Sequence, residues 1–136
     1  MKKIDNFSKC LNVLKGADFT MASSNEIYCT GVIGQYNLTF ELAWKALQAV
    51  LQAHGVIDFK SGSLREVLKI AYKVGFIEQE EVWLLMLKTR NASIHIYNEN
   101  EINEIICLIR DSFIAAFDHL LEVLCQKNAA CEINHE

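Results

Sequence analysis

The sequence contains no proline and only six glycines among its 136 residues. With 51% hydrophobic residues, this composition excludes a collagen-like chain, a proline-rich linker and an intrinsically disordered protein. No apolar run approaches the roughly 20 residues that a membrane-spanning helix needs. The first residues also lack the apolar core of a signal peptide. We therefore expect a single domain in the cytoplasm, without contact to a membrane.

The sequence also lacks the common motifs that bind metals and cofactors. Its five cysteines are an odd number and form no C-x-x-C pair, so a zinc site is not expected. There is no G-x-G-x-x-G, P-loop, H-E-x-x-H or G-x-S-x-G motif. We expect no metal, no cofactor and free thiols. Cys10, Cys107 and Cys125 lie at apolar helical positions and are expected to be buried.

Positive charge is in the minority, with 13 Lys and Arg against 17 Asp and Glu and a net charge of −4. This balance argues against a large nucleic-acid groove. It permits a small basic pocket, because phosphate contacts are local. Candidates for such a pocket are Lys45, Lys60, Lys88 and Arg90.

Apolar residues recur at helical spacing through most of the chain, and no strand alternation competes with them. Capping boxes at Ser23-x-x-Glu26 and Ser63-x-x-Glu66 predict two helix starts, and Gly55 predicts a helix end. We expect helices from about residue 4 to 21, from the Ser23 cap to 54, from the Ser63 cap to 74, from 78 to 90, and from 101 to 127. The pattern predicts an all-α, antiparallel up-and-down bundle of about five helices with a four-helix core, formed by residues 1–127. Residues 128–136 are expected to be a flexible tail.

A polar cluster lies between the last two predicted helices and combines Arg90, Asn91, His95 and Tyr97. In an unbroken helix, Arg90 and His95 would point about 140° apart. They can converge only if the helix ends or distorts near residues 91–93, or if a second subunit supplies one of them. Asn98, Asn100 and Asn103 indicate that a new helix starts just downstream, which favours a helix break in this segment.

If the two side chains converge, they suit RNA cleavage without a metal. An imidazole with a pKa of about 6.5 can transfer a proton at neutral pH, and a guanidinium can bind a phosphate and stabilise its developing charge. The 2′-hydroxyl of RNA is the nucleophile. The structural alternative is that Arg90 caps a helix C-terminus, while His95 and Tyr97 pack at the end of the bundle.

Glu41 and Lys45 form a second polar feature, at the i,i+4 spacing and in the orientation that favours an ion pair on a helix. One interpretation is an ordinary ion pair on the helix surface beside Trp44. The other places Glu41 and Lys45 at the lip of a functional site.

Several segments together resemble a known family. They are residues 36–45, Gly55, residues 64–68, residues 75–77, Trp83, Arg90-Asn91, His95 and Tyr97. Their order and spacing resemble the nucleotidyltransferase substrate-binding protein family, within the HEPN superfamily of helical bundles, over about residues 4 to 125. The block Arg90-Asn91-x-x-x-His95-x-Tyr97 is similar to the R-x4-H-x-Y signature of the toxin-type members.

The resemblance implies a toxin subunit that is a metal-independent endoribonuclease and acts as a homodimer. Arg90 and His95 would be catalytic and Asn91 would support them. The partner would be a separately encoded minimal nucleotidyltransferase, the antitoxin, which would modify Tyr97 with AMP. Two alternatives remain open: a non-catalytic substrate-binding subunit of a two-component nucleotidyltransferase, and a purely structural bundle.

Overall fold

The computed structural model describes residues 1–57, 63–92 and 98–135 of the chain, and the side chains up to residue 129. Its helices are α1 (Lys2–Lys15), α2 (Phe19–Ala22), α3 (Glu26–Ala53), α4 (Leu64–Lys73), α5 (Glu80–Ala92), α6 (Glu99–Leu108) and α7 (Ile114–His135), with a π-helical turn (Ile109–Phe113) between the last two. Among the described residues, no helix is both long and apolar enough to cross a membrane.

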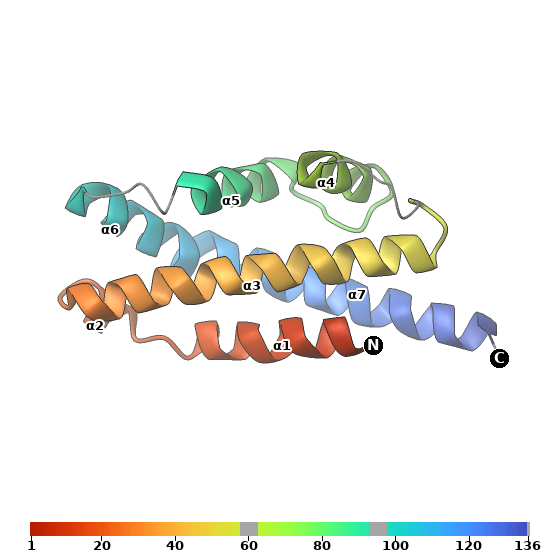
Figure 1. The fold of residues 1–136 in the computed structure, drawn as a ribbon, viewed down its shortest axis with the longest axis horizontal. Coiled ribbons are helices and arrows are strands. Elements are labelled where there is room, and N and C mark those ends of the chain that lie inside the picture. Colours follow the sequence, from red (N-terminus) through yellow and green to blue (C-terminus); the bar gives the residue numbers. More distant parts are fainter. Residues whose placement is uncertain (58–62, 93–97, 136) are drawn as a thin grey trace.

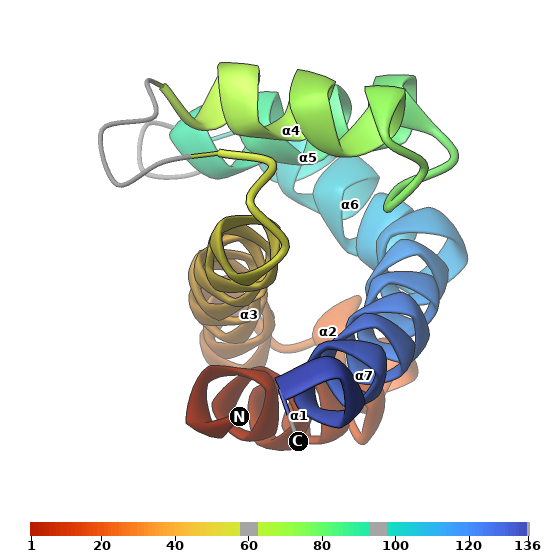
Figure 2. The same ribbon diagram turned by 90° about the vertical axis from the view of Figure 1, so that its right-hand side faces the viewer.

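The helices form an antiparallel up-and-down bundle, as the sequence predicted (Figure 1). The chain passes along the molecule through α1, returns through α3, crosses the bundle in α4, passes back through α5, and returns again through α6 and α7 (Figures 1 and 2). Helix α3 is central, since it contacts α1, α4, α5, α6 and α7. The end-on view places α1 on the opposite side of the bundle from α4 and α5 (Figure 2).

The N-terminal part differs from the single helix expected over residues 4–21. Helix α1 ends at Gly16, and α2 starts anew at Asp18. The Asp18 carboxylate accepts hydrogen bonds from the backbone N–H groups of Thr20 and Met21, each at 3.0 Å. This cap satisfies N–H groups at a new helix start, so the chain turns where the apolar pattern alone predicted continuity.

The predicted helix caps are confirmed in part. The Ser63 hydroxyl accepts a hydrogen bond from the Glu66 N–H and starts α4, as predicted. Gly55 follows the end of α3 with a φ of 71°, a conformation that favours glycine. The capping box at Ser23 was wrong. Asn25 caps α3 through the N–H of Tyr28, and the Ser23 hydroxyl donates to the Thr20 carbonyl of the preceding turn.

The last predicted helix runs through α6, the π-helical turn and α7 without leaving the bundle (Figure 1). The sequence predicted that this helix ends at residue 127 and that a tail follows. That end was wrong, because α7 continues to His135. The flexibility of residues 128–135 stays a prediction, and residue 136 lies outside the described residues.

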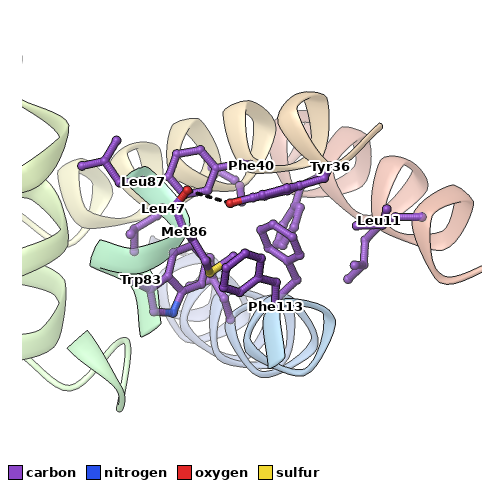
Figure 3. Packing of buried hydrophobic residues seen from close by; sticks show 14 of the residues in the cluster. Leu11, Tyr36, Phe40, Leu47, Trp83, Met86, Leu87 and Phe113 are labelled. Carbon is purple, nitrogen blue, oxygen red and sulfur yellow. Dashed lines mark hydrogen bonds between the residues drawn. The ribbon is translucent and has the colours of Figure 1, made fainter. Parts of the chain in front are cut away.

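The core is built around aromatic side chains from several helices. The rings of Tyr36 and Phe113 lie 5.3 Å apart, and the ring of Phe117 lies 5.8 Å from that of Trp83. These aromatic residues are at most 2% exposed. Figure 3 shows Tyr36 and Phe40 of α3 facing Trp83 and Met86 of α5 across this core. Helices α3 and α5 are therefore held in a fixed relation by packing.

The prediction that three thiols are buried was wrong for two of them. Cys10 is buried, but Cys107 and Cys125 are exposed, and these three cysteines are free. The apolar stripe of a helix fixes which positions can face the core. A residue at its edge, such as Cys107 on α6, is buried only if a neighbouring helix covers it.

Candidate functional site

The carboxylate of Glu41, in the middle of α3, binds three side chains. Its Oε2 atom accepts hydrogen bonds from the Trp44 indole N–H at 3.0 Å and from Nη2 of Arg90 at 3.1 Å. Its Oε1 atom lies 3.3 Å from the Lys45 ammonium. The ion pair predicted between Glu41 and Lys45 is confirmed, and the bond to Arg90 adds a contact from another helix. We call these four residues the Glu41–Arg90 site.

Arg90 reaches Glu41 because a hydrogen bond one helical turn earlier joins α5 to α3. The buried hydroxyl of Tyr36 donates a hydrogen bond of 2.7 Å to the backbone carbonyl of Met86 (Figure 3). Met86 lies four residues before Arg90, so it is one helical turn away. Two polar contacts from α3, through Tyr36 and Glu41, thus fix the last turns of α5.

Hydrogen bonding shifts the pKa of Glu41, and burial shifts the pKa of Tyr36. The pKa of Glu41 is lowered, first by the hydrogen bond from Trp44, and further by Lys45 and by the charge of Arg90. Burial raises the pKa of Tyr36, against a smaller opposing effect of the Arg90 charge. At neutral pH, Glu41 is therefore an anion and Tyr36 a neutral hydrogen-bond donor.

The guanidinium of Arg90 is bound by Glu41 but remains partly exposed to solvent. The side chain of Arg90 is 38% exposed and that of Glu41 is 31% exposed. Nη1 of Arg90 donates to the Asn91 side-chain oxygen at 3.2 Å. Asn37, Leu38, Glu41, Arg90 and Asn91 line an open hollow of about 480 Å³. An arginine held in this way can bind a phosphate oxygen from solution.

His95 and Tyr97 lie outside the described residues, as does Lys60. Convergence of Arg90 and His95 within one chain was predicted to need a helix end or distortion near residues 91–93, and the structure describes the helices on both sides of that segment. Helix α5 ends at Ala92, two residues after Arg90, and Asn98 caps the start of α6 through the N–H of Asn100 at 2.8 Å. A new helix therefore starts downstream of Arg90, as the sequence predicted, while residues 93–97 between the two helices lie outside the described residues. The meeting of Arg90 and His95 itself stays a prediction.

Arg90 also fits the structural alternative, because it lies in the last turn of α5, where a cation suits the helix dipole. The bond to Glu41 goes beyond that role, since a helix cap needs no partner on α3. The contributions of Asn37, Leu38 and the Trp44 indole were not predicted from the sequence. The signal available was spacing: Asn37, Glu41 and Lys45 recur every four residues and so share one face of α3.

Within the described part of the chain, no group of three or more His, Cys, Asp or Glu side chains is placed to hold an ion. The Glu41–Arg90 site combines a guanidinium, a neighbouring ammonium and one carboxylate that binds both.

Known proteins similar to this chain include a relative found by sequence and two solved structures. One relative is a Haemophilus influenzae protein named probable ribonuclease HepT, 26% identical over 100 residues, which are 72% of this chain and 68% of the relative. A solved structure from Thermus thermophilus is similar with a TM-score of 0.74 and 26% identity, over 87% of this chain and 98% of that one.

A second solved structure, from Haemophilus influenzae, shares the fold at 19% identity, with a TM-score of 0.75 over 89% of this chain and 98% of that one. It is described as having the fold of a substrate-binding domain of a nucleotidyltransferase. The family model described as "nucleotidyltransferase substrate binding protein like" matches residues 2–126, and the chain belongs to this family.

Proposed function

We propose that this chain is the ribonuclease toxin subunit of a HEPN-type toxin–antitoxin pair and cleaves RNA in the cytoplasm with Arg90 and His95. The observation that carries the proposal is the guanidinium of Arg90, which Glu41 holds at an open hollow two residues before α5 ends. The R-x4-H-x-Y spacing of Arg90, His95 and Tyr97 supports it, as does the name of the HepT relative.

The proposed reaction uses the nucleophile that RNA carries. His95 removes the proton of a 2′-hydroxyl, and the resulting oxygen attacks the adjacent phosphorus. Arg90 stabilises the charge that builds on the phosphate oxygens. The bond from phosphorus to the 5′-oxygen breaks, and that oxygen takes up a proton. The products are a 2′,3′-cyclic phosphate and a free 5′-hydroxyl, and in a homodimer the second His95 supplies the proton to the leaving oxygen.

The proposed regulation acts on Tyr97. A partner nucleotidyltransferase would join its phenol oxygen to the α-phosphorus of ATP and release pyrophosphate. The attached adenylate is bulky and anionic and lies two residues from His95. It would block access of RNA and repel its phosphates.

The direct test is RNA cleavage by Arg90→Ala and His95→Ala, with the fold checked by circular dichroism. Both variants should lose cleavage by about 100-fold or more, as expected for a removed charge stabiliser or acid–base group. Asn12→Ala, an exposed change on α1, is the control and should cleave normally. Normal cleavage by both site variants would contradict the proposal.

The second candidate is a non-catalytic subunit that completes a two-component nucleotidyltransferase, and the family description favours it. Co-expression with a minimal nucleotidyltransferase as the proposed partner, followed by intact mass measurement, separates the two. A gain of AMP units mapped to Tyr97 supports the toxin. A stable complex that is needed for transferase activity, without AMP on this chain and without RNA cleavage, supports the second candidate.

A further inference from the structure

A second open hollow, of about 590 Å³, lies between α4 and α5. Its lining includes Arg65 from the first turn of α4, and Leu85, Lys88 and Asn91 from α5. Asn91 also lines the hollow of the Glu41–Arg90 site, so the two hollows share a rim at the C-terminal end of α5. We call the second one the α4–α5 hollow.

The charge of the α4–α5 hollow is opposite to that of the chain as a whole. Arg65 and Lys88 are its charged lining residues, and no carboxylate lines it among the described residues. Within the same part of the chain, neither cation is in an ion pair. Other hollows on the molecule differ. One along α6 and the π-helical turn is lined by Glu104 and Asp111, and one at the start of α3 by Glu26 and Glu99.

The wall of the α4–α5 hollow is apolar between its cations. Leu84 is half-buried, and Leu85 is 39% exposed although it is a large apolar side chain. Apolar side chains can pack against a base, and neighbouring cations can contact its phosphate. Lys88 lies one turn before Asn91 and therefore near the shared rim.

We infer that the α4–α5 hollow is the subsite for a nucleotide that flanks the cleaved bond of single-stranded RNA, an inference that rests on the proposed function. Arg65 and Lys88 bind backbone phosphate, and Leu85 contacts the base. One strand crosses the Asn91 rim and occupies both hollows. This continuity with the Glu41–Arg90 site favours RNA over a docking protein. The subsite also places the local basic pocket that an acidic chain needs in order to bind RNA.

The test compares the double variant Arg65→Gln/Lys88→Gln with the wild type in the full-length chain. Binding of a fluorescein-labelled 2′-O-methyl octauridylate, which has no free 2′-hydroxyl to react, is measured by anisotropy over a range of salt concentrations. Loss of two phosphate contacts should weaken binding by about tenfold or more and reduce the salt slope of log K by about 1.4. In cleavage assays KM should rise, with kcat within about twofold of the wild type.

The matched control is Lys2→Gln/Lys9→Gln, which removes two exposed charges from α1 on the opposite side of the bundle (Figures 1 and 2). It should retain wild-type affinity and salt slope. If the double variant misfolds by circular dichroism, the single changes each serve instead and should reduce the slope by about 0.7.

Three results would overturn the inference: wild-type affinity and slope in the double variant, an equal loss in the α1 control, and no binding of the octauridylate by the wild-type chain. A fourth is lost binding of the partner nucleotidyltransferase with RNA affinity intact, which would make the hollow a protein-docking surface. The proposed function fails separately, through unimpaired cleavage by the Arg90 and His95 variants.

Discussion

Glu41 and Arg90 lie 49 positions apart in the sequence and meet through a hydrogen bond of 3.1 Å between Oε2 and Nη2. The same oxygen accepts the Trp44 indole N–H, so the carboxylate is itself held in place. The pair remains partly open to solvent. A guanidinium in this state is oriented without being shielded, which suits the binding of a phosphate that arrives from outside.

Glu41→Gln should separate substrate binding from catalysis. The change removes a negative charge beside the bound phosphate, so KM for RNA should fall. It also weakens the hold on Arg90, so kcat should fall by about tenfold, because small misplacements of a catalytic group are costly. Steady-state cleavage kinetics measure both constants. Glu122→Gln, an exposed change on α7, is the matched control. An unchanged kcat in Glu41→Gln would show that Glu41 does not position Arg90.

The same variant should reveal a pH-dependent contribution to stability. The pKa of Glu41 is lowered in the folded chain, chiefly by the Trp44 hydrogen bond, while an unfolded glutamate titrates at about 4.3. The stabilisation is therefore complete above about pH 4.3 and is lost as pH falls through the folded-state pKa. Urea unfolding should find wild type more stable than Glu41→Gln by about 1 kcal/mol at pH 7. This difference should shrink toward pH 3, and a constant difference would contradict the prediction.

Tyr36→Phe removes only the hydroxyl that binds the Met86 carbonyl in the core. We expect a loss of about 1 kcal/mol in the free energy of unfolding, the typical net value of one buried hydrogen bond. Urea unfolding of Tyr72→Phe provides the control. Tyr72 is 48% exposed on α4, so its change should be within about 0.5 kcal/mol of zero. Equal effects of the two variants would refute a special role for the Tyr36 hydroxyl.

Phe117 on α7 should be a major determinant of core stability, because its ring lies 6.0 Å from that of Phe7 and 5.8 Å from that of Trp83. Phe117→Ala should cost about 3–5 kcal/mol, a large part of the roughly 5–15 kcal/mol by which a domain is stable. Phe117→Leu fills most of the space and should cost about 1 kcal/mol. Thermal unfolding measures both, against Val13→Ala at a position that is 62% exposed. A loss in Phe117→Ala no larger than that of Val13→Ala would contradict this account of the core.

Interactions within a few residues were predictable from the sequence. The helical periodicity predicted the helical segments but missed the break between α1 and α2, and the caps at Ser63 and Asn98 were visible as polar residues at the starts of apolar patterns. The ion pair of Glu41 with Lys45 was predictable for the same reason, since the helix brings side chains four residues apart onto one face. The apolar pattern also predicted the antiparallel bundle, and the family resemblance is confirmed as well.

Contacts between distant segments were decided only by the tertiary structure. The sequence could not show that Arg90 binds Glu41, because this depends on the packing of α5 against α3 around Tyr36 and the Met86 carbonyl. The exposure of Cys107 depended in the same way on which helix faces receive a neighbour. The amino-acid sequence by itself thus determined the helices and the residues available for phosphate chemistry. The packing of one helix on another determined which of them meet, because those contacts join residues that no local periodicity relates.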